Sequence, residues 1–193
     1  MSYYADRKSE WDCLDLIRQR WSSRAFDQER EVSDEDLCAM LEAAGMAPSC
    51  FNEQPWRFVA ARKGSKAFDA ICESMMPGNQ EWAPHSDVLL VMCCKLTFTY
   101  NGHQNRFARF DLGTAWGYLT LEAQSRGILC HGMGGFNPQE LRESLGIDPE
   151  FEIVALAAVG YYGDKSYLPE GVQKREEPAP RKAIKEIMLE PEL

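Results

Sequence analysis

The chain has 193 residues, of which 45% are apolar, so its size and composition favour one folded unit with a sizeable core and exclude global disorder. Lys and Arg total 21 against 30 Asp and Glu, and the formal charge of −9 disfavours a nucleic-acid partner while permitting a local site for one small phosphate. The longest apolar run, residues 88–94, is too short to span a membrane, and the cysteines have no framework spacing, so we predict a cytoplasmic protein without a membrane partner.

Apolar periodicity predicts helices interrupted by a few strands. Ser33 before an acidic run is typical of a helix N-cap, and Gly45 and Pro48 end that helix. The apolar run at 87–95 is typical of a central strand, on which the adjacent Cys93 and Cys94 point to opposite faces. The other predicted elements are helices at 10–20, after Gly64-Ser65, at 106–126 and at 138–145, a weak helix at 181–189, strands at 58–61 and 152–160, and a polar and aromatic flap at 96–105.

Two features of the second half of the chain bear on assembly. Gly113, Ala115 and Gly117 lower the helix propensity of 106–126, which indicates a packing role such as close approach of a subunit. Residues 161–180 carry three prolines and many charges with little periodicity. We expect one domain over 1–193, whose last part, about 163–193, is an extension that embraces a partner subunit.

Three short segments carry candidate chemistry. Arg20, Ser22 and Arg24 stand at a spacing of two, so an extended backbone would place them on one side as an anion clamp, although a solvated basic patch explains them as well. Residues 47–58 place hydroxyl, amide and carboxylate side chains between Pro48 and Pro55. That segment is either a rigid frame for a flat polar ligand or an ordinary connection from helix to strand.

The third segment is glycine-rich and covers residues 132–135. It fails the dinucleotide fingerprint because Asn137 stands where the third glycine belongs. Its backbone could lie against the face of a ring, or it could be a flexible turn. The three histidines are scattered without metal-ligand spacing, and the sequence contains neither a phosphate loop nor a nucleophile elbow, so we expect no metal site.

Arg20-x-Ser22-x-Arg24 and Pro48-Ser49-x-x-Asn52-x-Gln54-Pro55-Trp56 together resemble the FMN-dependent nitroreductase family, and the resemblance covers almost the whole chain. It implies an α+β nitroreductase-like fold, with a central mixed or mainly antiparallel sheet flanked by helices. It also implies an intertwined homodimer with FMN at the interface. The cofactor-binding residues that it implies are Arg20, Trp21, Ser22, Arg24, Pro48, Ser49, Asn52, Gln54, Gln80 (or Asn79), Met133, Gly134, Gly135 and Arg181, with Arg175 as the rival of Arg181.

The resemblance implies an FMN-dependent NAD(P)H oxidoreductase that reduces nitroaromatics, quinones or activated alkenes by a ping-pong mechanism. FMN would carry the hydride chemistry, so no side chain is expected to be a nucleophile, and Arg24 would stabilise negative charge at N1 and O2 of the flavin. The donor is NADH or NADPH. Two alternatives stay open: a flavin-processing enzyme or specialised flavin dehydrogenase of the same fold, and a non-catalytic flavin-binding redox sensor that uses exposed cysteines.

Overall fold

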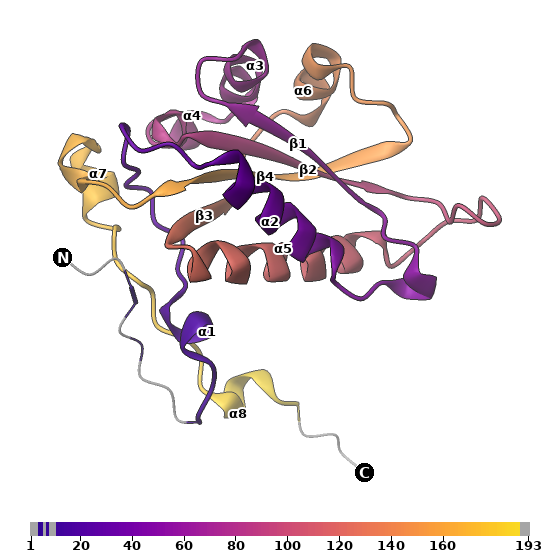
Figure 1. Cartoon of the computed structure of the whole chain (residues 1–193), viewed down its shortest axis with the longest axis horizontal. Helices are drawn as coiled ribbons and strands as arrows, with labels where there is room; N and C mark the ends of the chain where they lie inside the picture. The colour runs from indigo at the N-terminus through magenta and orange to yellow at the C-terminus, as the bar shows by residue number, and fades with distance from the viewer. Residues whose placement is uncertain (1–3, 6, 8–10, 190–193) are drawn as a thin grey trace.

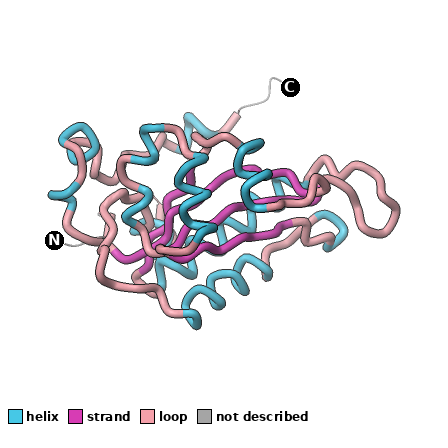
Figure 2. Tube along the Cα trace, turned by 90° about the horizontal axis from the view of Figure 1, so that it is seen from above, coloured by secondary structure: helices cyan, strands magenta, loops and turns pink. Residues whose placement is uncertain are grey.

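The computed structural model describes residues 4–5, 7 and 11–189. Its centre is an antiparallel sheet with the strand order β1-β2-β4-β3, so β2 and β4 are the inner strands. Figure 2 shows these strands running side by side along the length of the molecule. The strands are β1 (Trp56–Arg62), β2 (Val88–Lys95), β3 (Ile128–Met133) and β4 (Phe151–Tyr161).

The sheet separates two hydrophobic clusters, and β2 contributes to both. Leu89, Val91 and Cys93 pack into one cluster, while Leu90 and Cys94 pack into the other. A strand buried on both faces reads in the sequence as an unbroken apolar run, which explains why β2 was predictable. The expected opposite orientation of Cys93 and Cys94 is confirmed.

Helices cover both faces of this sheet, as Figure 1 shows: α3 and α6 lie over one face, α2 and α5 over the other. The N-cap predicted for α2 is confirmed, since the Ser33 side chain accepts a hydrogen bond from Asp36 N at 3.0 Å. An antiparallel sheet with helices on both faces agrees with the predicted α+β class. The helices and 3₁₀ turns are α1 (Asp15–Gln19), α2 (Asp34–Gly45), η1 (Cys50–Asn52), α3 (Lys66–Ser74), α4 (Pro77–Gln80), η2 (Ala83–His85), α5 (Ala108–Ser125), α6 (Pro138–Leu145), η3 (Lys165–Tyr167), α7 (Glu170–Gln173) and α8 (Ile184–Ile187).

Helix α5 packs alanine and leucine residues against the sheet and turns aromatic residues to the solvent. Of the small residues with a predicted packing role, Ala115 is buried, Gly117 is half-buried and Gly113 is exposed. Ala115, Leu119 and Ala123 are fully buried, whereas Phe110 is 73% exposed and Tyr118 is 44% exposed. Small side chains let the helix lie close to the strands. Among the described residues, Phe110 is largely uncovered, and Tyr118 lies in an open groove beside Leu16 and Ala43.

Helix α1 is shorter than predicted. The expected helix began at Glu10, which lies outside the described residues, but in the structure the helix covers only Asp15–Gln19. Trp11, Leu14 and Ile17 were expected to share a helical face with Trp21, yet they are 68%, 70% and 48% exposed while Trp21 is buried. A helix of little more than one turn is not stable alone. Of the four residues on the predicted face, only Trp21 is therefore buried.

Part of the C-terminal segment packs onto its own chain. Leu168 and Val172 are buried in the same cluster as Phe26 and Trp82. Gly163 N donates to Ala25 O at 3.1 Å, and a Cβ on Gly163 would come within 2.5 Å of backbone atoms of Phe26 and Asp27. Only glycine permits so close an approach of two backbones. That the remainder of 163–193 embraces a partner stays a prediction.

In the described part of the chain, no helix is both long and apolar enough to cross a bilayer.

Candidate functional site

The first arginine motif lies on an extended segment, residues 20–26, that runs beside β3. Burial alternates along it: Trp21, Ser23 and Ala25 are buried, while Arg20, Ser22 and Arg24 are partly exposed. This is the arrangement that a spacing of two predicts for an extended backbone. Arg20, Ser22 and Arg24 therefore share the accessible side, and the Trp21 indole lies on the buried side, where it packs near Tyr162 with ring centroids 6.3 Å apart.

A buried carboxylate anchors the backbone of this segment. Glu176 is only 4% exposed, and its oxygens accept hydrogen bonds from Ser23 Oγ, from Arg24 N at 3.0 Å and from Ala25 N at 3.2 Å. Tyr167 Oη adds a further acceptor for Phe26 N at 2.8 Å. Glu176 was not predicted from the sequence, because it is one of many charged residues near the C-terminus and has no distinguishing local signal.

Three guanidinium groups gather where this segment meets the two ends of the chain. Burial lowers the pKa of Arg20, and the nearby Arg181 lowers it further; the pKa of Arg7 is lowered by burial and by both Arg181 and Arg20. Arg7 Nη1 donates to Arg20 O at 2.6 Å, and Arg7 Nε donates to Ala179 O at 3.3 Å. Among the described residues, no carboxylate forms a salt bridge with Arg20 or Arg181. Cations that repel one another without a counter-ion are typical of an anion site.

The two candidates for the late arginine differ in their neighbours. The charge of Arg181 lowers the pKa of Arg20 and of Arg7. The pKa of Arg24 is lowered mainly by burial and further by the charge of Arg175. Arg175 Nε donates to Gly171 O at 3.0 Å and the side chain is exposed. The cluster thus contains the Arg181 predicted from the resemblance, together with Arg7, which was not predicted.

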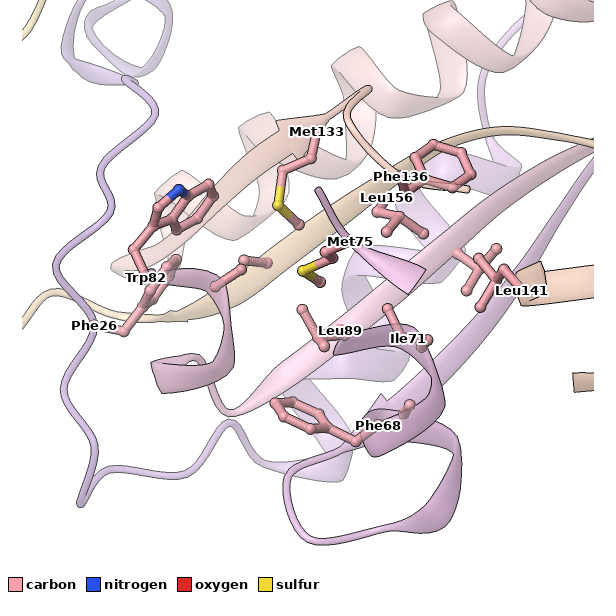
Figure 3. Close-up of a cluster of buried hydrophobic side chains, with 14 of the residues drawn as sticks. Phe26, Phe68, Ile71, Met75, Trp82, Leu89, Met133, Phe136, Leu141 and Leu156 are labelled. Carbon is pink, nitrogen blue, oxygen red and sulfur yellow. The ribbon is translucent and has the colours of Figure 1, made fainter. Parts of the chain in front are cut away.

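Arg24 lies over a fixed aromatic platform. Its Cζ atom is 5.7 Å from the centroid of the Trp82 ring, and that ring is 2% exposed. Figure 3 shows Trp82 and Phe26 at one end of the hydrophobic cluster, beside the extended segment, and their rings stack with centroids 6.3 Å apart. Burial of the platform fixes its position, so Arg24 rests on a rigid surface.

His131 adds a polar but uncharged group beside the two arginines. Its Nδ1 atom is 3.0 Å from Ser23 O, and its ring centroid is 4.4 Å from that of Trp82. Burial, with smaller contributions from Arg24 and Arg20, lowers the pKa of His131 to about 4. Because a carbonyl oxygen only accepts, the neutral ring carries its proton on Nδ1. At neutral pH, His131 therefore adds no positive charge to that of the arginines.

The glycine-rich segment follows β3 and is held by a neighbouring loop. Gly135 O accepts from Asn79 Nδ2 at 2.9 Å and from Met76 N at 3.0 Å, while Gly135 N has no acceptor among the described residues. An added Cβ on Gly135 would lie 3.1 Å from Asn79 Nδ2. The Met133 side chain is buried in the core, as Figure 3 shows. The segment thus offers an unused backbone donor at a place that is tight for side chains.

The predicted candidate whose side chain contacts this segment is Asn79, which lies in α4. Gln80, the preferred candidate of the sequence analysis, is exposed, and its Nε2 atom donates to Cys72 O at 3.1 Å. Adjacent residues on a helical turn point in different directions, which explains why the two separate. Of the pair considered, the structure places Asn79 beside Gly135.

The second predicted motif forms a strained turn around η1. Phe51, Asn52 and Gln54 have φ values of 52°, 55° and 51°, a region that residues other than glycine rarely occupy. Gln54 N donates to Ser49 Oγ at 3.0 Å, and the amide side chains of Gln54 and Asn52 are joined at 3.2 Å. Strain of this kind persists where surrounding contacts enforce it, and it concentrates at functional sites.

Hydrogen bonds with two residues outside the turn, Asp111 and Thr99, hold it in place. Cys50 N donates to Asp111 Oδ2 at 3.1 Å; Asp111 is 2% exposed, and burial raises its pKa. On the outer side, Glu53 Oε1 accepts from Thr99 N at 2.8 Å and from Thr99 Oγ1. Figure 1 shows the flap at 96–105 projecting beyond the end of the sheet next to η1. The flap is therefore attached to the motif that the resemblance places against the flavin.

Within one chain, the two motifs do not meet. The η1 turn is attached near the start of α5 through Asp111, whereas the arginine segment lies beside β3, which begins just after α5 ends. Figure 1 shows η1 and the segment that leads upward from α1 at opposite ends of the molecule. The structure brings Arg20, Arg24 and Arg181 to one end and leaves Pro48, Ser49, Asn52 and Gln54 at the other.

The buried His131 generates a prediction about pH. Its folded-state pKa of about 4 lies below the ordinary value of 6.5, so the unfolded chain takes up the proton first as the pH falls. The stability that neutral His131 contributes is complete above about pH 6.5 and decreases by up to about 3 kcal/mol toward pH 4. Urea unfolding at pH 7 and pH 5 should show a smaller decrease for His131→Gln than for the wild type. Equal decreases in the two proteins would contradict the assignment.

Several known proteins are similar to this chain in structure or in sequence. A solved structure described as an oxidoreductase containing FMN has a TM-score of 0.91 and 37% identity, covering 98% of this chain and 97% of that chain. An Archaeoglobus fulgidus protein with the provisional name NADH dehydrogenase/NAD(P)H nitroreductase is 29% identical over 158 residues, which are 80% of this chain and 87% of the relative. A 5,6-dimethylbenzimidazole synthase of Rhodospirillum rubrum is 27% identical over 186 residues, covering 82% and 86% of the two chains.

The family comparison covers both motifs and the sheet. The pattern that defines the nitroreductase family matches residues 17–76 and 61–161 of this chain. These ranges include the arginine segment, the strained turn, all four strands and α5. The match spans well over half of the sequence, and the chain belongs to the nitroreductase family.

Proposed function

We propose that this member of the family is an FMN-dependent NAD(P)H oxidoreductase that reduces nitroaromatics, quinones or activated alkenes by a ping-pong mechanism. The observation that carries the proposal is the cluster of Arg7, Arg20 and Arg181, which has no carboxylate salt-bridge partner among the described residues. Arg20 stands on the same extended segment as Arg24. The similar structure at 37% identity is described as containing FMN, which supports the same cofactor here. The phosphate of FMN matches the cluster in charge.

The candidate residues can be assigned to successive parts of FMN. Arg20, Ser22 and Arg181 would hold the phosphate, and Arg24 would lie toward the pyrimidine side of the ring, where a cation stabilises developing negative charge. The unused N–H of Gly135, with Gly134 before it, would donate to the ring edge. When bound, FMN supplies hydride transfer, so the chain has to bind, orient and shield but needs no nucleophile.

We also propose that a second copy of the chain completes each site. The motif around Ser49, Asn52 and Gln54 lies too far from Arg20 to serve the same cofactor within one chain, and a homodimer would bring the partner's copy of the motif to it. The exposed Trp11 and Leu14 of the N-terminal region and Phe110 of α5 would then be covered.

The C-terminal extension has a surface to bind in such a dimer. An open groove of about 250 Å³ lies between α1, α2 and α5 and is lined by Leu16, Ala43, Tyr118 and Leu121, with Glu122 and Ser125 at its polar side. In α8, Ile187 is 61% exposed and is followed by the exposed Met188. Apolar side chains on a short terminal helix match such a groove on a partner.

A flavin-processing activity is the second candidate. It is favoured by the similarity to a protein named 5,6-dimethylbenzimidazole synthase over most of the chain. In that case FMN would be consumed rather than retained. Mass spectrometry of the flavin before and after incubation with a nicotinamide donor separates the two, since an oxidoreductase returns FMN unchanged.

The central test is whether the purified protein carries a reducible flavin. We expect a yellow protein whose absorbance near the flavin maximum is bleached anaerobically by NADH or NADPH and returns when a quinone or nitroaromatic is added. A yellow protein that neither nicotinamide bleaches would favour the sensor. A colourless protein that does not take up FMN on titration would refute the proposal.

The arginine cluster predicts which late arginine matters. Arg20→Ala and Arg181→Ala should each weaken FMN binding by about 1.5–3 kcal/mol, the usual contribution of a hydrogen bond to a charged group. Arg175→Ala removes the same charge from an exposed position nearby and is the matched control, so its FMN affinity should stay close to that of the wild type. Fluorescence titration of the apoprotein measures all three. A loss in Arg175→Ala with none in Arg181→Ala would reverse the assignment.

A substitution at Gly117 on α5 tests the proposed dimer. An added Cβ at Gly117 meets no atom within 4 Å in the single chain, so Gly117→Leu should fold normally. If α5 makes a close subunit contact, the larger side chain disturbs dimerisation. Sedimentation velocity should show more monomer for this variant than for the wild type. An intact dimer with unchanged affinity would place the close contact elsewhere.

A further inference from the structure

Among the described residues, the buried carboxylate of Glu176 has no role in the function proposed above. Glu176 lies in the C-terminal segment after α7, where the flanking Arg175 and Glu177 are exposed, yet it is 4% exposed itself. Among the described residues it forms no salt bridge with Lys or Arg. Its partners are one hydroxyl and the backbone amides of Arg24 and Ala25.

This arrangement is costly unless every hydrogen bond is kept. A buried carboxylate loses its hydration, and only several well-placed donors compensate for that loss. Here Oε1 accepts from Ser23 Oγ and from the amides at 24 and 25, and Oε2 accepts from Arg24 N at 3.0 Å. A carboxylate can accept from several donors at once, which no neutral side chain of similar size does as well.

The bonds determine where Arg24 points. Glu176 fixes the amide of Arg24 itself and the amide that follows it, and thereby the backbone from which the Arg24 side chain leaves. On the other side, the buried Trp82 ring supports the guanidinium at 5.7 Å. The backbone of Arg24 is therefore fixed by the Glu176 carboxylate, and its guanidinium group is supported by the Trp82 ring.

The charge of Glu176 also reaches Arg24 through space. Burial lowers the pKa of Arg24, and the proximity of Glu176 opposes that shift. An anion beside a cation reduces the positive potential that the cation produces at a third site. Glu176 would thus weaken the field of Arg24 at the proposed flavin while fixing its direction.

We propose that Glu176 is a positioning residue of the cofactor site. It holds residues 23–25 so that Ser22 and Arg24 face the flavin, and its negative charge weakens the positive potential of Arg24 at the flavin. The inference rests on the proposed FMN function. It makes the C-terminal segment part of the site of its own chain, in addition to any contact with a partner.

The experiment compares FMN affinity and the midpoint potential of bound FMN in four proteins. Glu176→Ala removes all the acceptors and should weaken FMN binding about tenfold or more. Glu176→Gln keeps one oxygen acceptor, so it should retain FMN within a few-fold of the wild type. Its midpoint potential should become more positive, since an anion that disfavours the reduced, more negative flavin is gone. Glu177→Gln makes the same charge change one residue away on the surface and should alter neither quantity.

The outcomes separate this inference from the proposed function. If the wild type does not bind FMN, both fail. If the wild type binds FMN and Glu176→Ala binds it equally tightly, or Glu176→Gln has the potential of the wild type, the inference alone is overturned. Should Glu176→Ala not fold, the potential of Glu176→Gln relative to Glu177→Gln decides.

Discussion

The extended segment at 20–26 has backbone amides that no regular ladder satisfies, and much of the site depends on how they find acceptors. The segment makes only an isolated bridge to the end of β4, between Phe26 and Tyr162. Glu176 and Tyr167, both from beyond β4, supply the missing acceptors. Because unpaired buried amides are strongly unfavourable, the arginine segment and the chain beyond β4 must order together.

The strained turn at the other end is also held by a buried carboxylate, but this carboxylate stands on a different kind of element. Asp111 accepts from Cys50 N and, like Glu176, lies buried with no cation bonded to it among the described residues. Asp111 stands on a long helix that packs on the sheet, whereas Glu176 stands on an irregular segment. The turn is thus held by a rigid element, and the arginine segment depends on a part of the chain with less regular structure of its own.

Features that depend on residues close together in the sequence were largely predicted, and a feature that depends on distant residues was not. Strand β2 and the cap at Ser33 were predicted because burial on both faces and local capping leave marks in adjacent residues. Strand β3 was missed because His131 and Gly132 interrupt its apolar run, although both pair with β4. The common side of Arg20, Ser22 and Arg24 was predicted from their spacing, whereas their role at a flavin was implied by the resemblance. Glu176 was out of reach, since its partners lie about 150 positions away and nothing in the neighbouring sequence marks it.

Both halves of the proposed site store unfavourable energy in the isolated chain. At one end, guanidinium groups repel one another and have no salt-bridge partner in the described part of the chain. At the other end, non-glycine residues hold positive φ angles. Each feature destabilises the fold locally, and the proposed ligand would offset that cost, with its anion between the arginines and its flat ring against the turn. A ligand that binds only the folded chain adds stability by mass action. In a protein with a formal charge of −9, a concentrated positive site also determines where an anion binds, because the rest of the surface repels it.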